Sequence, residues 1–270
     1  MSNDLIENPG RRLQALLQEI YPFDNSGSKS FVTEIDNAIV AEGEFARLLY
    51  QSSINYLIRR LITSAEYLKR KYASYPEGRD IEEIRAFLRD FTRIPNSQSE
   101  KIFTVLMECL KSRKRKIPQK QKDDIRREAR IRGEKCYICG CEIDFERANE
   151  SQFNAFTLDH IWPRKMGGKS SLDNLKVACK RCNENKADNI DASDFHYEEI
   201  CLVTDKVDKN FNTEFKKGYK IAVSAKSEFK CVVCGQPVER VGELYFARRE
   251  PSDNWHFLNI DAYCSEHTPE

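Results

Sequence analysis

The sequence predicts an α+β protein in three parts. These are an α-helical bundle in residues 1–115, a central strand–loop–strand–helix module with a structural zinc in residues 116–200, and a small β-rich zinc-binding module in residues 201–270. Apolar residues recur at three- and four-residue spacing through the first part, as one face of a helix requires. Two Cys-x-x-Cys pairs bracket the second part, and a Cys-x-x-Cys with a Cys-x-x-His marks the third. These observations together predict the fold class.

Composition restricts the class of protein. The 270 residues are 40% hydrophobic and 32% charged, which favours a folded globular protein over a disordered chain. No apolar run approaches the roughly 20 residues that a membrane helix needs, and the start of the chain lacks the basic and apolar regions of a secretory signal. We therefore expect a cytoplasmic protein with no membrane partner, whose close cysteine pairs bind metal rather than form disulfides.

The N-terminal part carries helix signals and no catalytic motif. Asn8 and Pro9 form a helix start, and apolar residues follow at helical spacing. Gly43 divides the next periodic stretch, residues 31–72, into two helices. Two further helices are expected before residue 110. A bundle of this kind is expected to serve in packing, in homodimerisation or in the binding of a protein partner.

Positive charge is concentrated next to this bundle. Residues 111–135 carry 12 basic and 4 acidic side chains, a net charge of +8 in a chain whose total is only +1. Helical composition resumes at 119–132 and ends at Gly133. A solvated helix face or a linker would explain the charge, but a phosphate backbone would also attract it. The side chains expected to contact phosphate here are Lys114, Arg115 and Lys116.

Cysteine spacing predicts a first zinc site. Structural zinc takes four tetrahedral ligands, which proteins present as two close pairs. The two pairs are separated by 39 residues, which is long for a simple finger and leaves room for a functional module. A zinc ribbon without an active centre is the alternative. The expected ligands are Cys136, Cys139, Cys179 and Cys182. The cysteines left over, which are expected to be small buried apolar residues, are Cys109, Cys141 and Cys201.

A second set of ligands follows in the C-terminal part. Its two close pairs are separated by 29 residues. The expected ligands are Cys231, Cys234, Cys264 and His267. His256 is a rival for the last position, but the Cys-x-x-His spacing favours His267. This zinc is expected to stabilise a small β-rich unit that lacks a large core, and the binding of nucleic acid or protein is the alternative.

Four residues near the first zinc site suit phosphodiester chemistry. Asp159 and His160 are adjacent, Asn174 follows, and Asn183 comes directly after the last cysteine. A neutral imidazole can take a proton from water near pH 7. Carboxylate and amide oxygens favour Mg²⁺ or Mn²⁺, and such an ion can stabilise the leaving oxygen of a phosphate. Neighbours on a strand point to opposite faces, so a bend near Pro163 is expected.

The same stretch resembles the HNH endonuclease family, in the zinc-bracketed branch that has a ββα-metal fold. The resemblance covers roughly residues 130–190. Many family members have histidine where Asn183 stands, so the motif is an H-N-N variant. The matching motifs, in order, are Cys136/Cys139, Asp159-His160-Ile161-Trp162-Pro163, Gly167-Gly168, Asn174-Leu175, and Cys179/Cys182-Asn183 with Lys186.

The resemblance implies a role for each residue. His160 would be the general base that activates water. Asp159 and Asn183 would bind the catalytic Mg²⁺ or Mn²⁺. Asn174 would brace the loop that holds His160. The side chains expected to contact nucleic acid in this region are Arg164, Lys165, Lys169 and Lys186, and for Lys186 an exposed helix lysine is an equal alternative.

The expected function is therefore a metal-dependent endonuclease that hydrolyses DNA, with two structural Zn²⁺ ions and one catalytic Mg²⁺ or Mn²⁺. Phage defence or restriction is the expected context, by analogy with the family alone. The rival hypothesis is a non-catalytic, zinc-containing adaptor that binds nucleic acid or protein. Metal stoichiometry measured together with cleavage would separate the two.

Overall fold

The structure, a computed structural model, describes residues 8–23, 31–202 and 217–269. The chain divides into two compact units, each assembled from segments that are distant in sequence. Unit 1 comprises Met1–Ser30, Leu49–Lys116 and His160–Leu175, and unit 2 comprises Phe31–Leu48, Ile117–Asp159 and Lys176–Glu270. Helices dominate the N-terminal region and small two-stranded sheets follow, which confirms the α+β class. The predicted domain bounds stay predictions.

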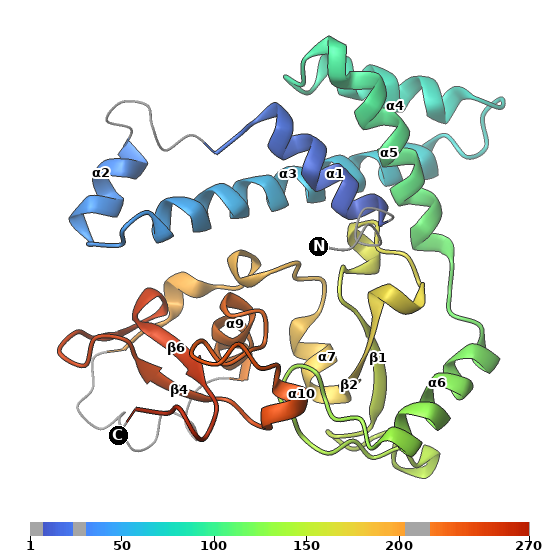
Figure 1. Cartoon of the computed structure of the whole chain (residues 1–270). Coiled ribbons are helices and arrows are strands. Elements are labelled where there is room, and N and C mark those ends of the chain that lie inside the picture. The colour runs from blue at the N-terminus through green and yellow to red at the C-terminus, as the bar shows by residue number, and fades with distance from the viewer. Residues whose placement is uncertain (1–7, 24–30, 203–216, 270) are drawn as a thin grey trace. The chain divides into compact units, whose positions relative to one another are not determined.

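Unit 1 is built from helices whose apolar faces meet. It contains α1 (Pro9–Ile20), α4 (Arg79–Asp90), α5 (Asn96–Lys114) and most of α3 (Glu44–Lys71). Helices α1 and α4 both pack against α5, as Figure 1 shows. Side chains three and four residues apart form the core because they share one face of each helix. The buried side chains are Leu13, Leu17, Ile58, Leu61, Ile62, Ile84, Leu88, Ile102 and Leu106.

The predicted break at Gly43 is confirmed. Helix α2 (Phe31–Ala38) ends before Gly43, which has a φ of +87°, and α3 begins directly after it. The buried Asp36 carboxylate accepts hydrogen bonds from Gly43 N at 2.6 Å and from Ala46 N at 3.1 Å. It thereby satisfies donors at the start of α3 that have no partner within the helix.

The predicted strand–loop–strand–helix order is present. Strand β1 (Phe156–His160) pairs with β2 (Leu175–Cys179), and α7 (Lys180–Lys186) follows. Lys180 N donates to Ala155 O, and Ile161 N donates to Asn174 O. These bonds lie at opposite ends of the two strands, so the strands are antiparallel.

Helix α6 (Gln119–Arg132) precedes this module and has the predicted bounds. It ends at Gly133, whose φ of +61° suits glycine. Arg126, which belongs to the basic segment, lies on the buried face of this helix. Its guanidinium lies 4.9 Å from the centre of the Phe156 ring and 3.0 Å from a carboxylate oxygen of Glu150. Part of the positive charge of this segment is therefore used in packing.

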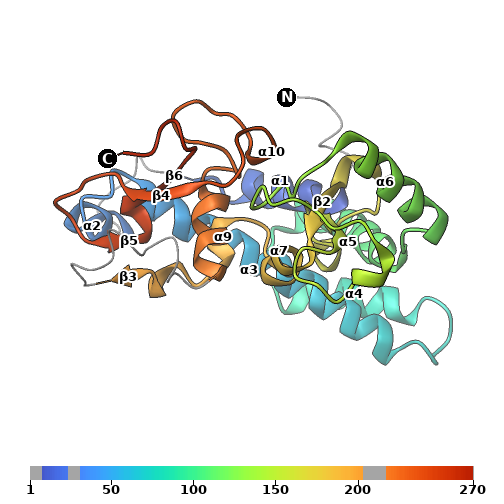
Figure 2. The same cartoon turned by 90° about the horizontal axis from the view of Figure 1, so that it is seen from below.

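The remainder of unit 2 combines short strands with helices. Strand β4 (Tyr245–Arg248) pairs antiparallel with β6 (Ile260–Tyr263), and β3 (Cys201–Leu202) pairs with β5 (Trp255–His256). Figures 1 and 2 show β4 and β6 side by side. The other elements of unit 2 are α10 (Val238–Val241) and the short 3₁₀ helices η2 (Arg147–Asn149), η5 (Ala192–Asp194), η6 (Tyr197–Glu199) and η7 (Phe257–Asn259), whereas the 3₁₀ helices η3 (Arg164–Met166) and η4 (Leu172–Asn174) belong to unit 1. None of the described helices is long and apolar enough to span a bilayer.

Helix α9 (Lys217–Lys226) lies where the sequence predicts a β-like region. Ile221 and Val223 are buried, and the helix packs against β6. Lys226 Nζ donates to Phe257 O at 2.9 Å and to Ile260 O at 2.6 Å, which ties the last turn of α9 to η7 and β6. The β-propensity of branched residues is weak and depends on context, so the packing of this face decides the structure.

Candidate functional site

Both predicted zinc sites begin with the same backbone turn. In the first, Gly140 N donates to Cys136 O at 2.8 Å, and Cys136 N donates to Cys141 O at 3.0 Å. In the second, Gly235 N donates to Cys231 O at 2.9 Å, and Cys231 N donates to Gln236 O at 3.0 Å. Gly140 and Gly235 have φ values of +69° and +66°, a conformation that residues other than glycine rarely adopt. The two turns therefore present their cysteines in the same way.

Each turn is also joined to the strand that leads to the second ligand pair. Tyr137 N donates to Val177 O at 3.1 Å, two residues before Cys179. Val232 N donates to Ala262 O at 3.0 Å, two residues before Cys264. The strands β2 and β6 thus close the long sequence gaps and bring the two ligand pairs together, although the two segments share no sequence repeat.

The first site gathers five thiols rather than four. The sulfur atoms of Cys136, Cys139, Cys141 and Cys179 all lie within 4.8 Å of one another. The predicted ligand Cys182 is not one of these four, but it is buried and its thiol interacts with those of Cys136, Cys139 and Cys179. Hydrogen bonds from Cys139 and the other thiols lower the pKa of Cys136, so a thiolate is favoured where a cation would bind.

The position of Cys141 in the first site was not predicted, because this cysteine belongs to no Cys-x-x-Cys pair. The only sequence signal was its position directly after the turn that carries Cys136 and Cys139. The structure sets this residue among the zinc-site thiols and not as the isolated apolar residue that was predicted. The same expectation is confirmed for Cys109, which is buried, and burial raises its pKa to about 12. It is wrong for Cys201, which is exposed on the two-residue strand β3.

The second site brings the four predicted ligands together. The side-chain ligand atoms lie within 4.8 Å of one another. His267 Nδ1 lies 3.0 Å from Cys264 Sγ and 3.9 Å from Cys231 Sγ. Burial raises the pKa of Cys231, but backbone N–H donors at Cys234 and neighbouring residues outweigh burial and lower it to about 6. The rival His256 instead contacts Asp253 at 2.9 Å.

The four predicted catalytic residues are divided between the two units. Asp159 and Asn183 belong to unit 2, and His160 and Asn174 belong to unit 1. Asp159 and His160 are consecutive residues at the end of β1.

In unit 2, Asp159 is a buried carboxylate with two partners on one oxygen. Asp159 is 4% exposed. Tyr137 Oη donates to Asp159 Oδ2 at 2.5 Å, and Lys186 Nζ lies 3.0 Å from the same oxygen. Burial, followed by the charge of Asp159, raises the pKa of Tyr137, so the phenol keeps its proton. Lys186, predicted to contact phosphate or to be exposed, is buried in an ion pair with Asp159.

Asn183 lies one turn before Lys186 on α7 and is half-buried. Its Nδ2 donates to Leu158 O at 3.4 Å. Within the described part of the chain, Asn183 Oδ1 receives no hydrogen bond. The amide oxygen is therefore left as an acceptor beside β1, which suits the predicted metal ligand.

In unit 1, the geometry around His160 selects one tautomer. His160 Nε2 lies 2.9 Å from Ser170 Oγ, and Ser170 Oγ donates its single proton to Arg115 O at 3.0 Å. Ser170 can then only accept from His160, so Nε2 carries the proton. Neutral His160 consequently has its basic lone pair on Nδ1. Ser170 and the Arg115 carbonyl were not predicted, because their contact joins residues 55 positions apart.

Asn174 spans the loop that follows His160. It is 3% exposed. Its Oδ1 accepts from Trp162 N at 2.8 Å, and its Nδ2 donates to Trp162 O at 3.0 Å and to Lys169 O at 2.8 Å. These three bonds hold two separate points of the loop, which is the contact pattern that a bracing role requires.

The same loop is fastened to α1 and α5 within unit 1. Ser112 Oγ donates to Gly167 O at 3.0 Å, and Gly10 N donates to the same oxygen at 3.3 Å. A Cβ atom on Gly167 would lie 2.6 Å from Cys109 Sγ, and one on Gly10 would lie 1.9 Å from Trp162 Nε1. Only glycine permits this approach. The N-terminal helices therefore support the loop that begins at His160.

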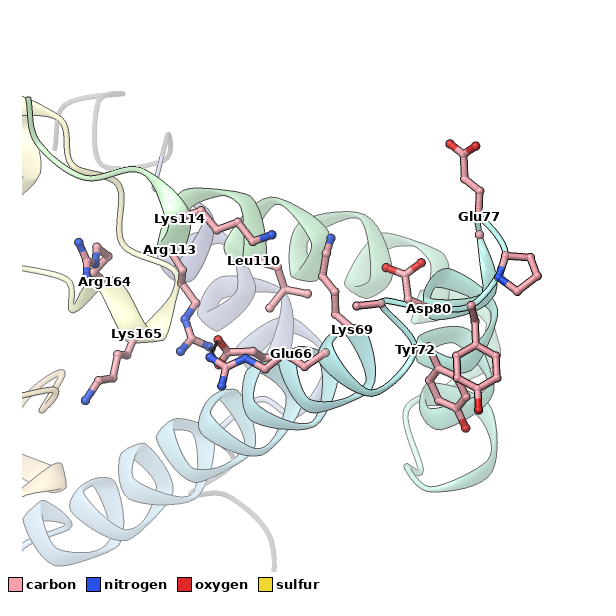
Figure 3. A pocket seen from close by; sticks show the side chains of 15 residues that line it. Glu66, Lys69, Tyr72, Glu77, Asp80, Leu110, Arg113, Lys114, Arg164 and Lys165 are labelled. Atoms are coloured by element: carbon pink, nitrogen blue, oxygen red, sulfur yellow. Dashed lines mark hydrogen bonds and ion pairs between the residues drawn. The ribbon is translucent and has the colours of Figure 1, made fainter.

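The predicted nucleic-acid contacts fall into different places. Arg164 and Lys165 lie on η3, and together with Lys114 they line a cavity of unit 1 that Figure 3 shows. Arg115 and Lys116 are exposed after α5, and Lys169 is half-buried beside Asn174. The structure thus groups three of the predicted cations at one cavity, and Lys186 is instead used in an ion pair with Asp159.

Comparison with known proteins supports the resemblance. Residues 136–194 match the family model described as HNH endonuclease. The match covers less than a quarter of the chain and contains the first zinc site and all four predicted catalytic residues. Comparisons with curated proteins and with solved structures give no match.

Proposed function

Since residues 136–194 are similar to HNH endonucleases, we propose that this protein is a divalent-metal-dependent endonuclease that hydrolyses phosphodiester bonds of DNA in the cytoplasm. The observation that carries the proposal is the His160–Ser170–Arg115 hydrogen-bond chain, because it orients an imidazole whose Nδ1 is basic. The HNH resemblance implies products with 5′-phosphate and 3′-hydroxyl ends.

The general base in this proposal is His160. Its Nδ1 takes a proton from the attacking water, and Ser170 holds the opposite nitrogen and fixes the ring. Asn174 holds the loop that follows His160 in its conformation by hydrogen bonds to Trp162 and Lys169. Ser170 is a positioning residue, because it acts through His160 and does not touch the reacting atoms.

Asp159 and Asn183 would hold a catalytic Mg²⁺ or Mn²⁺. Their carboxylate and amide oxygens are hard ligands, and Asn183 Oδ1 has no donor among the described residues. When bound, the ion would polarise the phosphate and stabilise the leaving oxygen. The Lys186 ammonium lies 3.0 Å from Asp159 Oδ2, so the metal would have to displace it from that oxygen or bind through the other carboxylate oxygen.

Two structural Zn²⁺ ions complete the proposal. The first would be held by four thiols drawn from the five-cysteine group, which includes the predicted Cys136, Cys139, Cys179 and Cys182. The second would be held by Cys231, Cys234, Cys264 and His267. Because zinc closes long loops in both places, metal binding would contribute directly to folding.

The test is plasmid nicking by the purified zinc-loaded protein with Mg²⁺ or Mn²⁺. His160→Ala should abolish nicking without changing zinc content or the thermal transition. His196→Ala is the matched control, because His196 is 81% exposed in its side chain and lies outside the predicted centre. Intact plasmid with every divalent metal, or equal loss of activity in both variants, would contradict the proposal.

One observation favours the alternative of a non-catalytic adaptor for nucleic acid or protein. The Lys186 ammonium occupies the Asp159 oxygen that a catalytic metal would use. Under this hypothesis the protein binds two Zn²⁺, binds no Mn²⁺, and does not cut DNA. Mn²⁺ titration followed by paramagnetic resonance separates the hypotheses, because the endonuclease requires a Mn²⁺ site that Asp159→Asn removes.

The biological context is proposed from family analogy alone. Phage defence or restriction would suit an endonuclease that acts on foreign DNA. The helices of unit 1 would support a homodimer or a protein partner. Cutting of both strands would then require two copies of the centre, so the oligomeric state of the active protein is the relevant measurement.

A further inference from the structure

A cavity of about 610 Å³ lies within unit 1, apart from the residues proposed to do chemistry. Its walls come from the last turn of α3, the turn that leads to α4, the last turn of α5, and η3 (Figure 3). Three acidic residues line it, Glu66, Glu77 and Asp80. Six basic residues also line it, namely Lys69, Arg70, Arg113, Lys114, Arg164 and Lys165.

The local sequence explains part of this charge. Cations in the last turn of a helix are stabilised by the negative end of the helix dipole, and the last turns of α3 and α5 are both basic. The dipole does not explain the third segment. Arg164 and Lys165 belong to the short η3, which reaches the cavity because Gly167 is fastened to α5. Cations from three distant segments therefore converge.

Ion pairing uses only some of these charges. Glu66 accepts from Arg70 at 2.6 Å and from Arg113 at 2.6 Å, so one carboxylate orients two arginines. Within the described ranges, Lys69, Lys114 and Arg164 have no ion-pair partner. Three cations thus face the cavity without a neutralising group of the protein.

The charges are also separated along the cavity. Figure 3 shows Lys69 and Lys114 on neighbouring helices beside Arg113 and Glu66, with Arg164 and Lys165 beyond them. Asp80 lies beside Lys69, on the side away from Arg164 and Lys165, and Glu77 lies farther along in the same direction. An anion would be attracted to the basic end and repelled from the acidic end. The charges of the cavity therefore favour a negatively charged ligand at its basic end.

We propose that the basic end of this cavity binds phosphate groups of the nucleic-acid strand, on the side of the loop that follows His160. The inference rests on the proposed function for the identity of the polyanion. Arg164 lies four residues after His160, on the loop that Asn174 holds, so a strand bound at η3 would contact the same loop that carries the predicted base. Arginine matches phosphate oxygens with a fork of donors, and the two lysines act as point charges.

The experiment measures DNA binding by the full-length, zinc-loaded His160→Ala protein, so that cleavage does not interfere. Into this background are placed Lys69→Ala, Lys114→Ala and Arg164→Ala together. Removal of each phosphate-binding cation should make the slope of log K against log salt concentration about 0.9 less negative. Because three cations are removed, raising salt from about 50 to about 200 mM should weaken the variant's binding about 40-fold less than it weakens the parent's.

The matched control is Lys101→Ala, an exposed lysine of α5 that does not line the cavity. It should leave the slope unchanged, whereas Lys114→Ala alone should make the slope about 0.9 less negative. Asp80→Asn at the acidic end should strengthen binding. Circular dichroism and zinc content serve as checks that each protein folds.

The outcomes distinguish this inference from the proposed function. A changed slope in the triple variant, together with no plasmid nicking by the protein that keeps His160, supports the phosphate site and contradicts catalysis. Nicking by the protein that keeps His160, together with an unchanged slope in the triple variant, overturns the phosphate site and leaves the enzyme. Competition by inorganic phosphate or a mononucleotide, with no change in DNA affinity on substitution, would assign the cavity to a free ligand and overturn the inference.

Discussion

The substitution Lys186→Met tests the buried pair between Asp159 and Lys186. Both side chains are 5% exposed, and the ammonium lies 3.0 Å from Asp159 Oδ2. Methionine keeps most of the apolar stem and removes only the charge. Asp159 is then left buried with the Tyr137 hydroxyl as its remaining described donor on that oxygen. Loss of one partner from a buried ion pair costs about 3–5 kcal/mol, because an uncompensated charge stays in a poorly solvated site.

The expected consequence is a large thermal shift. For a protein of this size, each kcal/mol lowers Tm by roughly 2–4 °C, so the variant should melt about 6–20 °C below the parent. Differential scanning calorimetry of the zinc-loaded protein measures the shift. The double variant Lys186→Met/Asp159→Asn should recover most of the loss, because an uncharged pair has no desolvation penalty to offset.

The control is Lys176→Met, which removes an ion pair of 3.3 Å to Glu239 in which the lysine is 50% exposed. Exposed pairs contribute about 0–1 kcal/mol, so its Tm should change little. If the two lysine variants lose equal stability, or if the double variant recovers nothing, the argument from burial is wrong. The Lys186→Met protein should also bind Mn²⁺ more tightly, because the competing ammonium is gone, and weaker binding would count against a metal at Asp159.

Three further predictions concern the thiols, the His160 partner and the Gly167 loop. Cys182→Ser and Cys141→Ser should each keep two zinc ions per chain, since five thiols surround a metal that needs four. The double variant should lose one zinc, as measured by atomic emission. Loss of zinc in either single variant would contradict the idea that Cys141 and Cys182 can each serve as the fourth ligand. Ser170→Ala should lower kcat about 10- to 100-fold with little change in KM, because the imidazole loses its orienting partner; unchanged kcat in nicking assays would exclude a positioning role. Gly167→Ala should destabilise the protein by about 1–3 kcal/mol, since the φ of Gly167 is +84° and the new Cβ would lie 2.6 Å from Cys109 Sγ. Adding Cys109→Ala should restore part of the lost stability in thermal melts. A Gly167→Ala protein as stable as the parent would refute the close packing.

Helix bounds were largely predictable because their signals are local. Pro9 at the first turn of α1, Gly43 before α3 and Gly133 after α6 each act within a few residues. The cysteine pairs were predictable for the same reason, since a metal ligand pair needs a spacing that the chain displays directly. Helix α9 was not predictable, because burial of its apolar face against β6 outweighs a weak local preference.

By itself, the sequence determined the residue types of the predicted centre: Asp159, His160, Asn174 and Asn183 between and beside two thiol pairs. Only the tertiary structure decided how those groups are held. It brought Lys186 and Tyr137 to one oxygen of Asp159, and it linked His160 through Ser170 to the carbonyl of Arg115. It also joined Cys141 to the first zinc site and gathered six cations around one cavity. The physical reason is that these contacts join residues far apart in the chain, whereas spacing along the sequence predicts only which close neighbours, such as the Cys-x-x-Cys pairs, can act together.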